Sequence, residues 1–172
     1  MKNNTKRLVL SALFCALIAI FSQIIIPLPS GIPFTLQTLA VALCGFYLGP
    51  IYSLLSIGVY ILLGAVGLPV FSGFLGGAGV LFGKTGGFII GFVFLSLLCA
   101  LSLNAQRKTV SIFLLIFSVI LCHLFGILHI SLIYKTPFLE NFFIFSLPFL
   151  IKDYIFVFAA KKICSTIKKR FN

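Results

Sequence analysis

The chain has 172 residues, 61% of them hydrophobic and only 9% charged, and its mean hydropathy is +1.25. A soluble domain is about half apolar and about a quarter charged, so this composition excludes a soluble fold and predicts an integral membrane protein. The net charge of +11 would suggest nucleic acid in a soluble protein. Here the basic residues cluster at the ends of apolar segments, which favours contact with anionic lipid and no nucleic-acid partner.

Long apolar runs without alternation predict helices, since a membrane-spanning helix needs about 20 apolar residues. Six spans are predicted, at 8–26, 36–49, 51–66, 86–103, 110–133 and 143–160. The second and third are short and join at Gly49-Pro50, where a re-entrant or tilted arrangement stays open. We therefore expect an all-α membrane protein, a six-helix bundle that forms one domain over residues 1–172.

The first apolar run, from Leu8 to Ile26, follows a basic start as the core of a signal peptide does. It is longer than the roughly 7–15 residues of a signal-peptide core, and no small-x-small cleavage pattern follows, so we expect a retained helix. Within it, Ala12 and Ala16 form a small-xxx-small pair, which lets another helix approach closely. This face is predicted to dock a partner helix.

Three basic clusters predict the topology of the chain. They lie before the first span, between the fourth and fifth, and after the sixth: Lys2, Lys6, Arg7, Arg107, Lys108, Lys161, Lys162, Lys168, Lys169 and Arg170. With six spans all three fall on one side, which the positive-inside rule assigns to the cytoplasm. Both termini are therefore expected inside a multi-pass plasma-membrane protein, and the connections 27–35, 67–85 and 134–142 outside.

The outer connection that contains "GLPVFSGFLGGAGVLFGKTGG" is too apolar for a solvated loop and too rich in glycine for a stable helix. Irregular backbone at membrane depth is tolerated only where it is buried in protein or lines a cavity, so we expect this segment to fold back as a lid or floor. Its "AGVLFGKT" stretch has the shape of a phosphate-binding loop. That loop needs a preceding strand and an acid for magnesium, and neither is in place, so the match is interpreted as accidental.

Asp153 lies inside "FSLPFLIKDYIFVFAA", a helix that is otherwise apolar. A carboxylate there costs about 2.5–3.5 kcal/mol on insertion scales, so it needs a partner or a wet cavity. The adjacent Lys152 is the structural candidate, but neighbours on a helix point about 100° apart, and we favour an Asp153 that faces a ligand. Thr35 and Gln37, at the start of the second span, either cap the helix or contact the ligand, and the sequence leaves both open.

The two histidines lie on the fifth span, six residues apart and thus on different faces. His123 is expected to pack or hydrogen-bond between helices, and His129 to reach a cavity. Five cysteines are scattered through apolar segments without metal-binding spacing and are interpreted as small buried side chains. No metal site and no cofactor are predicted.

Three segments together resemble the biotin-specific BioY family of substrate-binding subunits of energy-coupling-factor (ECF) transporters: "IPFTLQTLAVALCGFYLGP", "YILLGAVGLPVFSGFLGGAGVLFGKTGGFIIGF" and "PFLIKDYIFVFAA". The resemblance implies a six-helix protein that binds biotin from outside and pairs with a transmembrane coupling subunit and two cytoplasmic ATPases. It implies that Ala12 and Ala16 contact the coupling subunit. The ligand-facing residues that it implies are Thr35, Gln37, Gly73, Gly76, Gly77, Thr85, Gly86, Gly87 and Asp153.

The chain departs from the family pattern at two places. The last helix of the family is similar to P-F-x-P-G-D-x-x-K, whereas this chain has Ile151 and Lys152 before the acid and Phe156 in place of the final lysine. Lys84 stands where the family has proline before T-G-G. The carboxylate of biotin needs a cation, and Lys84 or Lys152 is expected to supply it.

The predicted site suits the chemistry of biotin. The two N–H groups of the ureido ring match the Asp153 carboxylate, and its carbonyl matches Gln37 or Thr35. Phe34, Phe71 and the glycine-rich backbone suit the thiophane ring and the alkyl tail. No residue needs to do covalent chemistry.

The main hypothesis is therefore a biotin-binding transport subunit, not an enzyme, that is energised by ATP hydrolysis in its partners. The chain lacks an acidic relay for proton coupling, which supports this interpretation. One alternative is a stand-alone facilitator for biotin or a related vitamin. Another is an intramembrane enzyme, which would need several acids, a metal, or a nucleophile with its base; the chain has only Glu140 and Asp153.

Overall fold

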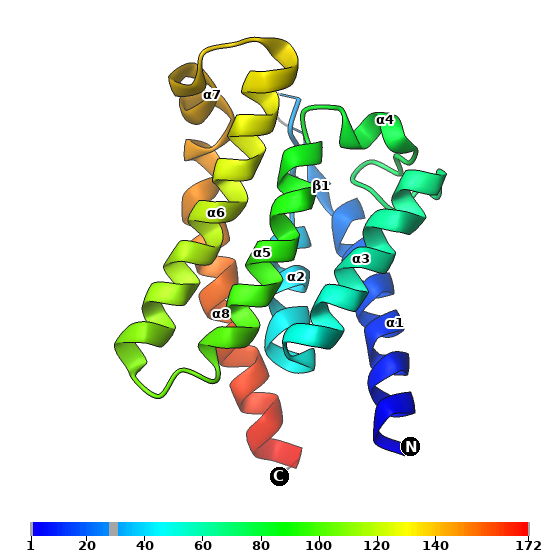
Figure 1. Ribbon diagram of the computed structural model, residues 1–172, viewed down its shortest axis with the longest axis vertical. Helices are drawn as coiled ribbons and strands as arrows, with labels where there is room; N and C mark the ends of the chain where they lie inside the picture. Colours follow the sequence, from blue (N-terminus) through cyan, green and yellow to red (C-terminus); the bar gives the residue numbers. More distant parts are fainter. Residues whose placement is uncertain (1, 28–30, 172) are drawn as a thin grey trace.

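The computed structural model of the protein describes residues 2–27 and 31–171, which form eight helices and one two-stranded sheet. The long helices lie side by side, and the start of α1 (Lys2–Gln23) lies at the same end of the bundle as the last turns of α8 (Leu147–Phe171) (Figure 1). At the opposite end lie two short helices, α4 (Ala78–Leu81) and α7 (Phe138–Phe145). The molecule therefore has an end that holds both termini and an end that is capped by connections.

The long helices agree with the predicted apolar segments within a few residues at most ends. Besides α1 and α8 they are α2 (Gln37–Leu48), α3 (Pro50–Val66), α5 (Gly86–Ser102) and α6 (Lys108–Tyr134). The prediction for the last segment, 143–160, is wrong at both ends, because residues 143–145 belong to α7 and α8 continues to Phe171. The axes of α7 and α8 differ by 55°. Pro148, in the first turn of α8, has no N–H to continue the hydrogen bonding of α7.

Within the described residues, Asn4–Gln23 and Lys108–Tyr134 are each long and apolar enough to cross a membrane, and the bent pair of α7 and α8 is a third candidate. Helices α2, α3 and α5 have 12, 17 and 17 residues, fewer than the roughly 20 of a perpendicular span. The number of spans and the cytoplasmic position of the termini therefore stay predictions. The position of both termini at one end of the bundle accords with them.

Helix α2 is the centre of the bundle. It packs against α1, α3, α5 and α8, and its buried face includes Val41, Cys44 and Phe46, each of which is fully buried. Gly49 ends α2 with a φ of 78°, a value that favours glycine, and Pro50 begins α3 at the position where its missing N–H costs nothing. The Gly49-Pro50 pair thus turns the chain sharply between two short helices.

Helices α5 and α6 approach each other closely through glycine. A Cβ on Gly91 would lie 2.8 Å from Cys122 Cα, and one on Gly126 would lie 2.5 Å from the ring of Phe88. Small residues are the usual means of close packing between helices in lipid. The exterior of the bundle carries exposed apolar side chains: Val66 on α3 and Leu132 on α6 are more than three-quarters exposed.

Two connections cover the end of the bundle away from the termini. Strand β1 (Ile25–Ile26) pairs antiparallel with β2 (Phe34–Thr35), which the sequence analysis did not predict. The glycine-rich connection between α3 and α5 folds back so that Phe71 is buried against Tyr60, with ring centroids 5.5 Å apart. Helix α4, and no strand, precedes the Gly83-Lys84-Thr85 stretch. This stretch of the described chain therefore follows a short helix, whereas a nucleotide-binding loop follows a strand.

Candidate ligand-binding site

A cavity of about 600 Å³ lies under the two connections. Small-molecule sites in proteins are about 300–1,000 Å³, are mostly apolar, and carry a few polar groups that orient the ligand. The aromatic rings of the wall come from Phe71, Phe88, Phe92, Tyr134, Phe145 and Phe149. Its charged groups are Lys84, Lys152 and Asp153, so the wall combines rings with a small set of polar side chains.

Eight residues expected to face a ligand lie in the wall of this cavity: Thr35, Gln37, Phe71, Gly73, Lys84, Thr85, Lys152 and Asp153. They come from three stretches of the chain that are far apart in sequence. The fold brings these stretches together where β2 enters α2, where the glycine-rich connection folds back, and where α8 begins.

Five other residues that were expected to face a ligand are not part of this wall: Phe34, Gly76, Gly77, Gly86 and Gly87. The ring of Phe34 packs instead against Phe149 and Phe156, with centroids 6.4 Å away in each case. It therefore stands behind the wall and supports it.

The four glycines are needed for backbone packing. A Cβ on Gly76 would collide with the carbonyl oxygen of Leu68, and one on Gly86 with that of Leu81. Gly77 has a φ of 97° and donates its N–H to Gly64 O at 2.7 Å. Gly87 lets α5 approach α6, since its Cβ would meet Phe125 O at 2.5 Å. A glycine pattern does not reveal whether the close neighbour is a ligand or another backbone.

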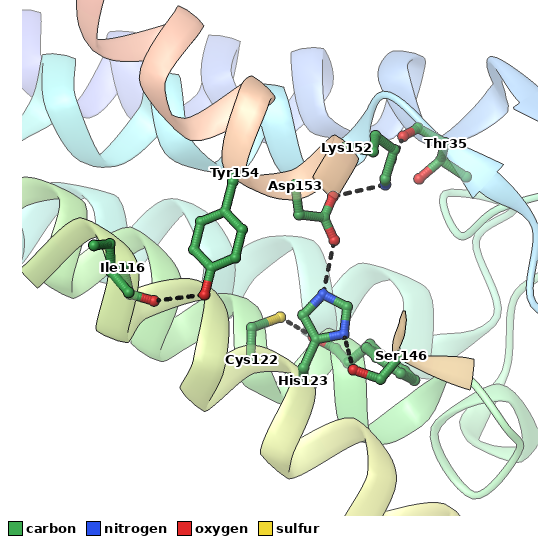
Figure 2. A network of polar contacts seen from close by, with 9 residues as sticks. Thr35, Ile116, Cys122, His123, Ser146, Lys152, Asp153 and Tyr154 are labelled. Atoms are coloured by element: carbon green, nitrogen blue, oxygen red, sulfur yellow. Dashed lines mark hydrogen bonds and ion pairs between the residues drawn. The ribbon is translucent and has the colours of Figure 1, made fainter. Parts of the chain in front are cut away.

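The carboxylate of Asp153 is the centre of a buried polar network (Figure 2). Its Oδ2 accepts a hydrogen bond from His123 Nε2 at 3.0 Å, and Ser146 Oγ lies 2.9 Å from the other ring nitrogen. Because a carboxylate only accepts, Nε2 carries the proton, and in the neutral ring the Ser146 hydroxyl donates to Nδ1. The other carboxylate oxygen, Oδ1, lies 2.7 Å from Lys152 Nζ, which also donates to Thr35 O at 3.3 Å.

The pairing of Lys152 with Asp153 contradicts the expectation that their helix positions keep them apart. That expectation considered only the directions in which the two side chains leave the helix, whereas the four-carbon stem of lysine bends back to reach its neighbour. Both residues are more than 90% buried and both still line the cavity. The expectation for His123 is confirmed, because it bonds across from α6 to α8.

Three aromatic rings surround the ammonium of Lys152. Its Nζ lies 4.8 Å from the ring centroid of Phe34, 5.6 Å from that of Phe149 and 5.4 Å from that of Phe156. Ammonium groups within about 6 Å of a ring face are attracted by its quadrupole. Phe156 is the residue that replaces the lysine of the resembled pattern, and the ammonium of Lys152 lies beside it.

Two buried side-chain oxygens make no hydrogen bond within the described part of the chain: Asp153 Oδ1 and Ser72 Oγ. The described contact of Oδ1 is its ion pair with Lys152 Nζ at 2.7 Å. Both residues line the cavity. Buried polar groups in proteins are almost always hydrogen-bonded, so these two oxygens mark places for the polar groups of a ligand.

Gln37 and Thr35 combine the two roles that the sequence left open. Gln37 Nε2 donates to the hydroxyl of Tyr60 at 2.6 Å, and that hydroxyl donates to Val70 O at 3.2 Å, which ties α2 to α3 and the glycine-rich connection. The backbone N–H of Gln37 reaches Thr35 Oγ1 at 3.4 Å. Both residues also line the cavity, so their hydrogen bonds stabilise its wall.

The sequence analysis missed several wall residues and misplaced one histidine. The polar ones missed include His123, Ser72, Thr38 and Tyr134. An ionisable group in an apolar helix was a usable signal for His123, while nothing distinguishes Ser72 within a glycine-rich stretch. The expectation for His129 is wrong, because it is absent from the cavity wall and its Nε2 donates to Gly83 O at 3.1 Å.

The fold and the site together define a class: a helical membrane protein with a partly polar cavity of about 600 Å³ at one end of its bundle. Comparison with known proteins identifies the family. The sequence model of the BioY family matches residues 1–172, and the chain belongs to this family. It is a multi-pass protein of the plasma membrane.

Individual relatives agree with this assignment. "Probable biotin transporter BioY" of Pyrococcus horikoshii is 35% identical over 88% of this chain and 90% of its own length. "Biotin transporter BioY" of Thermotoga maritima is 48% identical, over 51% of this chain and 52% of its own length. A solved structure described as the S-component for biotin from an ECF-type ABC transporter has a TM-score of 0.85 and 29% identity, and the match covers 98% of this chain and 93% of that one.

Proposed function

We propose that this chain is the biotin-binding S component of an ECF-type ABC transporter and that it mediates biotin uptake with energy from partner ATPases. Family membership and the similar solved structure support this proposal. The observation that carries it at the site is Asp153 Oδ1, a buried oxygen in the cavity wall that accepts no hydrogen bond within the described residues. The ureido ring of biotin offers N–H donors to such an oxygen.

The charges of the wall also suit biotin. The wall holds two ammonium groups, of Lys84 and Lys152, and one carboxylate, of Asp153, so its cations outnumber its anions. Lys152 is already paired with Asp153. This pair fits the neutral ureido ring, since the carboxylate accepts from its N–H groups and the ammonium donates to its carbonyl, while Lys84 attracts the carboxylate of the tail. Binding of this kind needs no covalent step.

The direct test is calorimetric titration of the detergent-purified chain with biotin, thiamine and riboflavin in turn. We expect saturable binding of biotin alone, at one molecule per chain. Heat from another vitamin instead of biotin would contradict the proposed ligand, and no heat from any of them, with a folded protein, would contradict a binding role.

Replacing Lys84 by methionine tests which group binds the tail of biotin. Lys84 lines the cavity from an exposed position, and its Nζ lies 5.6 Å from the ring centroid of Phe145. An exposed ion pair contributes modestly, so we expect a three- to tenfold loss, roughly, in affinity for biotin. Biotin amide, which has no carboxylate, should bind the variant and the unchanged protein equally well. Equal losses for both ligands would show that Lys84 does not contact the carboxylate.

Replacing Ala16 by tryptophan tests the proposed docking face. Ala12 and Ala16 are exposed on α1, as a face awaiting a partner helix requires. A tryptophan there should prevent close approach, so the variant should no longer co-purify with a coupling subunit, while its biotin affinity stays the same. Leu132→Trp, on the exposed face of α6, is the matched control and should still assemble. Biotin uptake that persists with Ala16→Trp would favour a stand-alone facilitator.

A further inference from the structure

Helix α7 crosses the capped end of the bundle beside the end of α6 (Figure 1). Four of its large apolar side chains are exposed: Phe138, Leu139, Phe143 and Ile144 are 42%, 67%, 56% and 42% exposed. Leu139 and Phe143 lie on the side of the helix opposite the buried Asn141, and the exposed Glu140 lies next to them. A solvated outer loop would leave these four large side chains in water. An exposed apolar patch of this kind indicates contact with something other than water.

The neighbouring helices indicate what that contact is. Leu128 and Leu132 on α6, and Leu147 and Ile151 on α8, are large exposed apolar side chains of a membrane-embedded bundle. Helix α7 lies between these two helices in the chain and packs against both of them. Two exposed charged residues accompany the apolar side chains of α7: Glu140 lies on the same side of the helix, and Lys135 lies in the connection before it. Apolar residues on one side with charges beside them are typical of helices that lie in the membrane interface.

We propose that α7 is an interfacial helix anchored in the phospholipid leaflet at the cavity end, and that this anchor holds one wall of the cavity in place. The inner side of α7 supports this. Phe145 lines the cavity, and Asn141 is buried and donates to Ser131 Oγ at 2.7 Å and to Thr136 Oγ1 at 2.9 Å. These bonds fix the helix to the end of α6, so that one face meets the cavity and the other meets lipid.

The bend after α7 connects the anchor to the polar network. Ser146 lies at this bend, and its N–H donates to Phe142 O at 3.1 Å. Its side chain bonds His123, which in turn orients the Asp153 carboxylate. A shift of α7 therefore acts on the hydrogen bond that positions this carboxylate. The lipid contact does not depend on the identity of the ligand, whereas its effect on ligand binding rests on the proposed function.

The chain has no tryptophan, so a single substitution gives a unique fluorescent reporter. Phe143→Trp and Phe145→Trp, on the outer and inner faces of α7, are compared in vesicles of phosphatidylcholine with brominated acyl chains. We expect a loss of emission with increasing brominated lipid for Phe143→Trp and little loss for Phe145→Trp. Ile144→Trp is a second outer reporter should Phe143→Trp fail to fold. Quenching by aqueous acrylamide instead would overturn the proposal, and so would protection from both quenchers, which would indicate a protein partner such as a second copy.

The effect on the site is measured as the rate of biotin dissociation from vesicles. Leu139→Ser with Phe143→Ser removes the apolar anchor without touching the cavity wall, and we expect dissociation about fivefold faster. Leu132→Ser, at an exposed apolar position on α6, is the control and should leave the rate unchanged. Equal rates in all three proteins would overturn the link between anchor and site. Absence of biotin binding in the unchanged protein would refute the proposed function instead, while the quenching result would still stand.

Discussion

Biotin binding should weaken about 10- to 100-fold when Asp153 is replaced by asparagine, since a hydrogen bond to a charged group contributes about 1.5–3 kcal/mol. Asparagine has nearly the same shape but no charge, and it presents only one acceptor oxygen where aspartate presents two. In the protein one oxygen accepts from His123 and the other faces the cavity beside Lys152. The variant therefore cannot serve both the imidazole and the ureido ring. Calorimetric titration of biotin into the purified variant measures the loss.

A second variant separates ligand contact from charge balance. Asp153→Asn leaves the buried ammonium of Lys152 without its counter-charge, which is destabilising in itself. Asp153→Asn combined with Lys152→Met removes both charges, and thermal unfolding shows whether each protein is folded. We expect the double variant to bind biotin as poorly as the single one, or more poorly. Affinity at the level of the unchanged protein would mean that the carboxylate only balances the lysine.

Much of the fold follows from the sequence because lipid imposes a simple rule. Each backbone polar group must be satisfied within its own segment, so long apolar runs become helices, and the runs ending at Leu48, Val66 and Ser102 end within a residue of their predicted limits. The cap of the bundle was less predictable. Its two short strands and helices α4 and α7 depend on contacts with the bundle end, which local sequence does not encode.

The candidate site, like the fold, could be predicted from the sequence only in part. Asp153 was identifiable because an acid in an apolar helix is costly and needs a partner. Its partners are His123 and Lys152. These contacts depend on the rotation of α6 against α8 and on the bending of a lysine side chain, and neither can be predicted from residue spacing. Ser72 became apparent only when its buried hydroxyl proved to have no hydrogen bond within the described residues.

Lys152→Met decides whether the ammonium beside Asp153 serves the ligand or blocks the carboxylate. Methionine has a similar length and no charge. If the ammonium donates to the carbonyl of the ureido ring, we expect a loss of about 10- to 100-fold in biotin affinity, again from a charged hydrogen bond. If the ammonium merely occupies Asp153, its removal should leave the affinity unchanged or raise it, and the proposed ligand site would be wrong. The measurement is the same calorimetric titration.

Adding Phe156→Lys to Lys152→Met then tests whether biotin binding needs an ammonium at this point in space, whichever residue of α8 carries it. The ring centroid of Phe156 is 5.4 Å from Lys152 Nζ, so a lysine at 156, one turn further along α8, can bring its ammonium to nearly the same point. We expect this double variant to regain a large part of the lost affinity. Lys152→Met with Ile155→Lys places the new charge on a face that is 59% exposed and should regain none. Recovery in both would indicate a general effect of charge. Recovery only with Phe156→Lys would mean that Asp153 and the rings of Phe34 and Phe149 define one ammonium position that either residue can fill.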